Sequence, residues 1–76
     1  MNWSDIQSNW AVCASRLESR FPKLDRHELW KLRRSRSSFE AYLAQSHDLT
    51  LGEAREEVED FLFIEGLARE LEFERV

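Results

Sequence analysis

The chain has few residues of the types that carry out catalysis or bind metals. Neither of its histidines, His27 and His47, has a second histidine, cysteine or carboxylate at a spacing typical of a metal site. The single cysteine, Cys13, has no histidine near it in sequence to activate the thiol. The sequence also contains no glycine-rich phosphate loop. We therefore expect no catalytic residues, no metal and no cofactor, and we predict that the protein is not an enzyme.

Basic residues concentrated in the middle of the chain suggest a different kind of chemistry. Residues 20–36 contain seven basic and two acidic residues, whereas residues 50–76 contain nine acidic and three basic ones. The basic side chains that would contact phosphates if they shared an exposed face are Arg26, Lys31, Arg33 and Arg34. On one helix these residues would spread around the axis and would not share a single face. Nucleic-acid binding is therefore our alternative hypothesis and not our leading one. The simpler interpretation is that the basic and acidic segments face each other within one fold.

Three helices would position these residues. Apolar residues recur every three or four positions in three stretches, and this spacing returns to one face of a helix. The stripes are formed by Trp3, Ile6, Trp10, Cys13 and Leu17, by Leu29, Leu32, Phe39 and Leu43, and by Ala54, Val58 and Phe61. Capping signals place the first helix start near residues 2–4, with Asn2 and Ser4 as equally good caps, the second just after Leu24 and the third at Thr50. The first helix should end at Phe21 and Pro22, and the second should run to about Gln45 or Ser46.

These elements predict an all-α fold, a small three-helix bundle formed by residues 1–61. Residues 62–76 are expected to be a helical extension of the same domain. The third helix either continues through them or is followed by a short fourth helix, because Gly66 could interrupt it. Seventy-six residues make a single domain of modest stability.

The extension supplies more apolar residues than one helix face needs. Phe63, Leu67 and Leu71 are spaced by four and lie on a side away from Ala54 and Val58. A helix that is apolar on two sides is usually buried on two sides, so a second copy of the chain or another protein is expected to cover this one. The candidate interaction residues are Trp30, Phe63, Leu67, Leu71 and Phe73.

Three individual residues each have two interpretations. Trp30 lies about 100° from Leu29 around the helix, so it is either an exposed interface residue or packed under the chain beyond Phe61. Arg36 falls in the apolar stripe of the second helix, and we expect its stem to be partly buried and its head to reach a carboxylate of the last helix. Cys13 is expected to be a reduced core thiol, with a reactive thiol as the alternative.

Composition excludes some locations. Apolar residues make up 42% and charged residues 34% of the chain, and no run approaches the ~20 apolar residues that cross a bilayer. The first ten residues lack the basic start and apolar core of a signal peptide. We therefore expect a cytoplasmic protein with no membrane partner.

The pattern as a whole resembles the CsbD-like family of small bacterial proteins over residues 1–61. The matching positions are Met1, Asn2, Trp3, Ile6, Trp10, Leu24, Leu29, Leu32, Arg36, Leu43, Leu49, Thr50, Glu53, Ala54, Val58 and Phe61. The resemblance implies a compact helical bundle, a bacterial cytoplasmic protein and a stress association, with no established activity. Family members typically carry glycines near Ser8, Ser15, Ala41 and Asp48, and their replacement here is expected to stiffen the helices.

Our leading hypothesis is therefore a non-enzymatic, CsbD-like helical protein, stress-associated by resemblance, that acts by protein–protein interaction or self-association.

Overall fold

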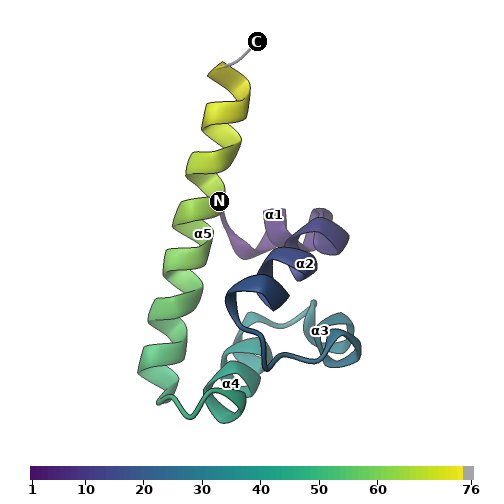
Figure 1. Ribbon diagram of the computed structural model, residues 1–76, viewed down its shortest axis with the longest axis vertical. Coiled ribbons are helices and arrows are strands. Elements are labelled where there is room, and N and C mark those ends of the chain that lie inside the picture. Colours follow the sequence, from purple (N-terminus) through teal and green to yellow (C-terminus); the bar gives the residue numbers. More distant parts are fainter. Residues whose placement is uncertain (75–76) are drawn as a thin grey trace.

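The computed structural model describes the backbone of residues 1–74 and the side chains of residues 1–71, and every regular element in this part is a helix (Figure 1). The helices are α1 (Trp3–Ser8), α2 (Trp10–Arg20), α3 (Arg26–Leu32), α4 (Arg36–Ser46) and α5 (Leu51–Glu74). The predicted all-α class is confirmed. The predicted number of three helices is wrong for this part of the chain, because the first and second predicted helices are each divided in two.

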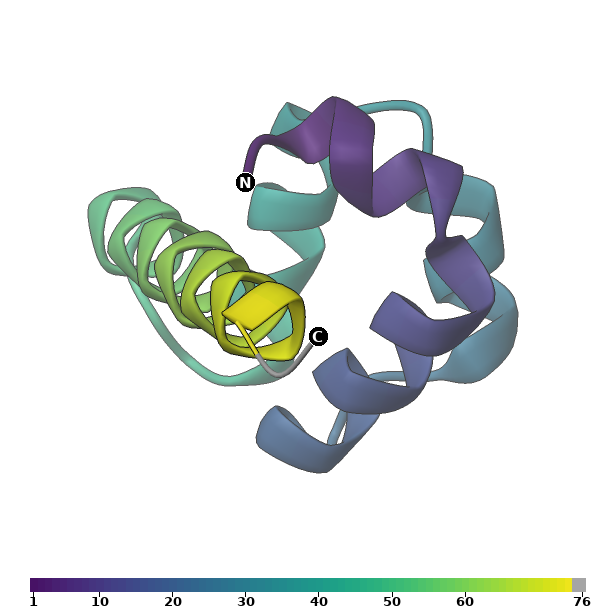
Figure 2. The same cartoon turned by 90° about the horizontal axis from the view of Figure 1, so that it is seen from above.

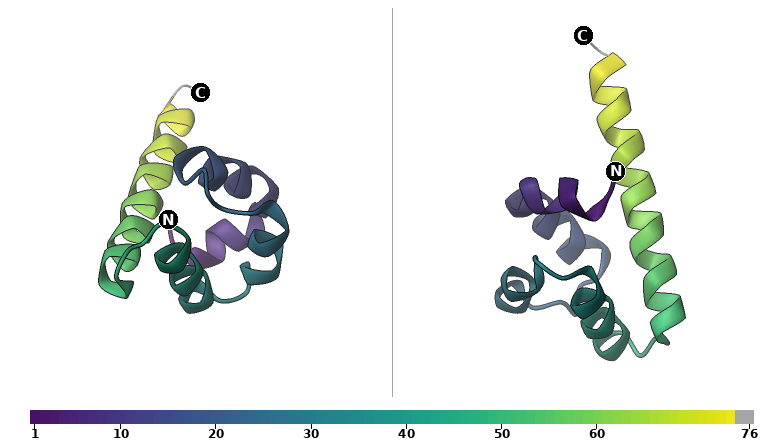
Figure 3. Two further views of the ribbon diagram at one scale, coloured as in Figure 1. Left: turned by 60° about the horizontal axis from the view of Figure 1, so that its bottom comes forward. Right: turned by 180° about the vertical axis from the view of Figure 1, so that it is seen from behind.

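The four short helices form an open ring beside α5. Seen from above, α1 to α4 curve around one side of the long helix (Figure 2), and α5 packs most extensively against α4. Views from below and behind show that the last turns of α5 extend past α1 and α2 (Figure 3). The molecule measures 40 × 23 × 20 Å, and its length follows α5, since 24 helical residues span about 36 Å.

Asn9 separates α1 from α2. Its backbone is not helical (φ −128°, ψ 46°), and its N–H donates to the Ile6 carbonyl over 3.2 Å. Asparagine side chains favour caps and turns over helix interiors, which is a physical reason for a break at this residue. The apolar stripe continues across the break, because Ile6 and Trp10 are both buried. Helix α1 begins with a capping box between Asn2 and Asp5, one of the two predicted starts.

Residues 33–35 separate α3 from α4. Ser35 starts α4, and its hydroxyl accepts a hydrogen bond from the Ser38 N–H over 3.2 Å. The Arg33 carbonyl, which no longer serves a continuous helix, accepts bonds from Trp3 Nε1 (3.0 Å) and Gln7 Nε2 (2.7 Å). Side chains of α1 therefore provide hydrogen-bond donors for the carbonyl that the break exposes. Because no buried carbonyl is left without a partner, the break costs little folding free energy.

The connection between α4 and α5 contains the only non-glycine residue with positive φ in the described chain, Asp48 (φ 55°). The Leu49 N–H returns to the Ala44 carbonyl over 2.8 Å, closing the end of α4. Asp48 is one of the positions near which the sequence resemblance predicts a glycine. The expectation that its replacement stiffens a helix is wrong here, because this residue lies between helices in a conformation that suits glycine.

Helix α5 is continuous through Gly66. Thr50 and Glu53 form the predicted capping pair, with reciprocal bonds of 2.9 and 3.0 Å. Of the two expectations for the extension, a continued helix is the correct one as far as Glu74.

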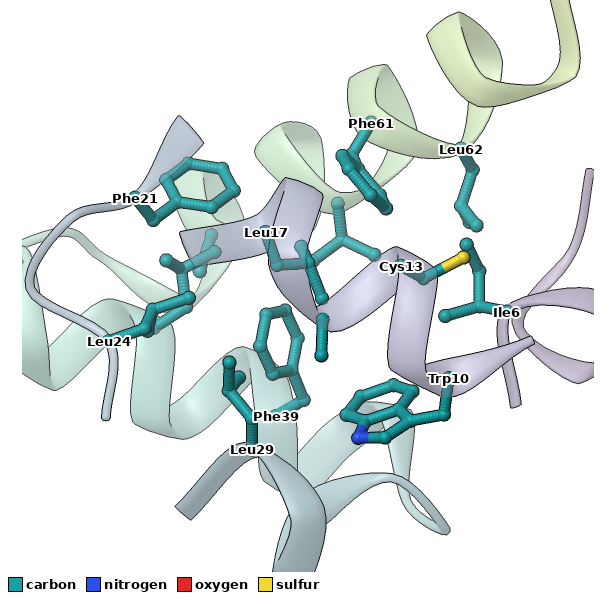
Figure 4. Close-up of a cluster of buried hydrophobic side chains, with 14 of the residues drawn as sticks. Ile6, Trp10, Cys13, Leu17, Phe21, Leu24, Leu29, Phe39, Phe61 and Leu62 are labelled. Atoms are coloured by element: carbon teal, nitrogen blue, oxygen red, sulfur yellow. The ribbon is translucent and has the colours of Figure 1, made fainter. Parts of the chain in front are cut away.

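The core lies where α2, α4 and α5 meet (Figure 4). Phe61 and Leu62 point from α5 toward Leu17 and Cys13 of α2 (Figure 4). Most residues of the three predicted stripes are buried, and Trp3 and Leu32 are partly buried beside them. Cys13 is 3% exposed, so the predicted core position of this thiol is confirmed.

Candidate interaction surface on the last helix

Two opposite faces of α5 carry apolar side chains. The inner face packs on the bundle through Ala54, Val58, Phe61 and Leu62, all buried. Four large apolar side chains lie on the other side and stay exposed: Phe63 (66%), Ile64 (48%), Leu67 (44%) and Leu71 (61%). At about 100° of rotation per residue, the other three lie within about 60° of Leu67 around the axis. We call these four residues the outer stripe.

Three ion pairs fix which side of α5 faces the bundle. Their charged atoms are close: Arg16 Nη1 to Glu65 Oε2 is 2.5 Å, Arg20 Nη2 to Glu57 Oε2 is 3.3 Å, and Arg36 Nη2 to Glu59 Oε1 is 2.5 Å. The arginines belong to α2 and α4, and every carboxylate belongs to α5. The expectation that basic and acidic segments face each other is therefore confirmed. Because the pairs hold the inner side in place, the outer stripe points to solvent.

Acidic residues accompany the outer stripe. Among residues 51–71, the exposed carboxylates within about 60° of Leu67 around the helix are Glu53, Glu56, Asp60 and Glu70. The arginines of α5 with described side chains, Arg55 and Arg69, lie about 120° and 160° from Leu67. Within residues 51–71, every charged residue on this side is therefore acidic. We call the stripe together with these four carboxylates the outer face.

The predicted interaction residues do not all share one surface. Phe63, Leu67 and Leu71 do, but Trp30 lies on α3, on the far side of the ring from the end of α5 (Figures 1 and 2). Trp30 is 44% exposed, with its ring 6.5 Å from that of Trp10 and beneath the Arg33 guanidinium. Of the two interpretations of Trp30, the described residues show the exposed one, and Trp30 lies on a different surface from the outer stripe.

Two further residues complete the comparison with the predicted set. The side chain of Phe73 lies outside the described residues. Ile64 was missed by the sequence interpretation, although its spacing of three from Leu67 and seven from Leu71 places it on the same side.

The predicted phosphate-contacting residues are largely engaged within the chain. Arg26 donates two bonds of 3.0 Å to the Glu18 carboxylate, and this pairing lowers the pKa of Glu18 and raises the pKa of Arg26. Lys31 lies 3.4 Å from Glu28, and the Arg33 guanidinium stacks on Trp30. Arg33 and Arg34 make no ion pair with a described side chain. Two of the four predicted residues, Arg26 and Lys31, are therefore paired with carboxylates of this chain.

A groove of about 510 Å³ lies between α1, α2 and the inner side of α5, and Cys13 and the Arg16–Glu65 pair line it. Burial, and then the nearby Glu65 carboxylate, raise the pKa of the Cys13 thiol, while Arg16 acts in the opposite direction. A protonated thiol is a poor nucleophile, so this groove offers no activated cysteine. Among the described residues, no group of histidine, cysteine and carboxylate side chains is arranged to hold a metal ion.

Comparison with known proteins adds no relative. No family model, no curated protein and no solved structure matches this chain. In the described part of the chain, no helix combines the length and apolar character that a membrane crossing requires.

Proposed function

We propose that the protein is a non-enzymatic helical binding module and that the outer stripe of α5 is its protein-binding surface. The observation that carries this proposal is the exposure of four large apolar side chains within nine residues of one helix, on the side opposite the core. Contiguous exposed apolar patches are uncommon on monomeric proteins and mark interaction sites. Isolated apolar residues on a surface carry no such meaning, but these four are neighbours.

The scaffold is suited to this role. Helix α5 is anchored to the bundle by packed side chains and by three ion pairs as far as Glu65, so the first residues of the outer stripe, Phe63 and Ile64, project from an anchored part of the helix. Presenting side chains from a preorganised helix reduces the entropy lost when a partner binds. Self-association is the simplest case of such binding, and association with a different protein is the other.

Sedimentation equilibrium at low salt and at about 1 M salt tests the stripe, because the Debye length falls to about 3 Å at the higher ionic strength. We expect the chain to be monomeric at low salt, where the acidic outer faces repel each other, and to self-associate reversibly at high salt. Leu71→Ser should abolish the association. Leu51→Ser is the matched control, since Leu51 is also 61% exposed and lies on the same helix about 160° from Leu67. A wild-type chain that stays monomeric at high salt would contradict self-association through the outer stripe and would leave a different protein as its partner.

Membership of the CsbD-like family, with its stress association, stays a prediction from the sequence resemblance. It predicts that the cellular level of the protein rises under general stress, which quantitative immunoblotting after heat and osmotic shock measures. An unchanged level would remove this part of the hypothesis and leave the binding surface unaffected.

A further inference from the structure

We infer that the partner of the outer face is a cationic amphipathic helix of another protein. This inference rests on the proposed function and names the partner class of the same surface. It follows from the distribution of charge, from the length of the surface and from what a second copy of the chain would bring.

The outer face has two chemically different halves. Its first half, toward the start of α5, carries Glu53, Glu56 and Asp60 on the side of the helix that faces solvent. Its second half carries the apolar stripe, with Glu70 at its margin. None of the six ion pairs in the described structure involves these four carboxylates. One oxygen of Glu53 accepts the capping bond from the Thr50 N–H, and the other carboxylate oxygens of the four residues are available to an incoming cation.

The geometry fits a helix lying alongside α5. From Glu53 to Leu71 the face extends for 18 residue steps, or about 27 Å at the rise of an α-helix. A partner helix of about 18 residues would match this length, with apolar residues at every third or fourth position against the stripe. Lysines or arginines at the other end of the same partner face would lie against Glu53, Glu56 and Asp60. The partner should therefore be divided into a basic and an apolar half, as the outer face is.

A second copy of this chain fits less well. In a parallel pair of α5 helices, each acidic residue would lie beside its own counterpart, Asp60 against Asp60 and Glu56 against Glu56. In an antiparallel pair centred on Leu67, Phe63 would meet Leu71 of the other copy, and the acidic halves of the two outer faces would lie at opposite ends of the pair, with no basic residue of either outer face beside them. The parallel pair therefore places like charges side by side, which opposes association, and the antiparallel pair leaves the carboxylates of the acidic halves unneutralised. A cationic partner covers the same apolar area and gains electrostatic attraction.

The test uses three designed helical peptides of about 18 residues that share one leucine stripe. They carry lysine, glutamine or glutamate at the positions facing Glu53, Glu56 and Asp60. Binding of each labelled peptide to the full chain is measured by fluorescence anisotropy at low and high salt. We expect the lysine peptide to bind at least about tenfold more tightly than the glutamine peptide, and the glutamate peptide to bind weakest. A higher salt concentration should lower the binding affinity of the lysine peptide only.

Variants assign the effect to the outer face. Leu71→Ser should lower the affinity of the chain for the lysine peptide about tenfold, and Leu51→Ser should leave this affinity unchanged. The double variant Glu56→Gln/Asp60→Asn should also weaken it several-fold and remove most of its salt dependence. Asp48→Asn is the matched charge control, since this exposed residue lies between α4 and α5 and outside the outer face.

The possible results separate the two proposals. Equal binding of the lysine and glutamine peptides, dependent on Leu71, would overturn the cationic partner and leave the outer stripe as a binding surface. Self-association at low salt that is tighter than any peptide binding would make a second copy the occupant and would also overturn the inference. If no peptide binds and the chain does not self-associate at high salt, the proposed function fails as well.

Discussion

Arg36 and Glu59 join α4 to α5 through a hydrogen bond of 2.5 Å between Nη2 and Oε1. The same guanidinium donates from Nε to Glu40 Oε2 over 3.0 Å. These two bonds, that to Glu59 first, raise the pKa of Arg36 against the opposing effect of burial. Glu40 is buried, with 8% of its surface exposed, so Arg36 also supplies the positive charge that a carboxylate in this position requires. The predicted role of Arg36 is thereby confirmed.

Arg36→Ala should lower the free energy of unfolding by about 1–3 kcal/mol, because the buried Glu40 carboxylate loses its charged partner. Urea unfolding followed by circular dichroism measures the change. Arg55→Ala is the control, since Arg55 is an exposed arginine of α5 outside the six ion pairs, and its replacement should change stability by less than about 0.5 kcal/mol. Equal effects of the two variants would show that the contact with Glu40 and Glu59 contributes nothing specific.

The Arg33 carbonyl gives a prediction about coupling, because Trp3 and Gln7 donate to the same oxygen. Trp3→Phe or Gln7→Met alone leaves one donor in place. The double variant leaves the carbonyl without either, and an unsatisfied, partly buried acceptor costs about 1–3 kcal/mol. We therefore expect the double variant to lose more stability than the two single variants together. Additive losses in urea unfolding would show that the donors act independently.

Asp48→Gly should stabilise the fold by about 0.5–1 kcal/mol, because glycine adopts φ 55° without the steric cost that aspartate incurs. Ala41→Gly should do the opposite and cost about 1 kcal/mol, since Ala41 lies inside α4. Both are positions where CsbD-like proteins are expected to carry glycine, so opposite shifts in melting temperature would separate the two local conformations. A loss of stability in Asp48→Gly would contradict the assigned turn.

Cys13 should contribute to stability in a pH-dependent way. Its pKa is raised in the folded state, so its contribution is complete below the ordinary thiol pKa and is lost as pH rises through the raised value. The difference in unfolding free energy between wild type and Cys13→Ala should therefore shrink above about pH 9. Labelling of the thiol by a disulfide reagent should be at least about 100-fold slower in the folded chain than in urea. Rapid labelling of the folded chain would indicate an accessible thiol.

The sequence was sufficient to predict which residues form the core. Spacings of three and four placed Ile6, Leu29, Phe39, Leu43 and Val58 inside, and all five are buried. The helix breaks were not predictable in the same way. The helical spacing of the apolar residues continues across both breaks, and neither break contains a glycine or a proline. The bonds that make the second break favourable come from Trp3 and Gln7, about thirty residues away in sequence, and local capping signals cannot report them.

The outer stripe was predictable in part for the same reason. Phe63, Leu67 and Leu71 follow from periodicity alone. The position of Trp30 depends on how α3 is oriented relative to α5, and this orientation follows from the break that the sequence did not reveal. The burial of Glu65 was missed as well, since it depends on Arg16 of α2 reaching across to it.

The packing of Gly66 against the start of the chain has a consequence for local dynamics. A Cβ at Gly66 would lie 3.1 Å from the Met1 nitrogen, so the bundle still contacts α5 at this level, and the turns beyond Arg69 extend past it (Figure 3). Amide hydrogens in the first half of α5 should therefore exchange slowly with solvent, and those near its end should exchange quickly. A partner seated on Leu67 and Leu71 would slow exchange in these last turns and leave the rate in the bundle unchanged.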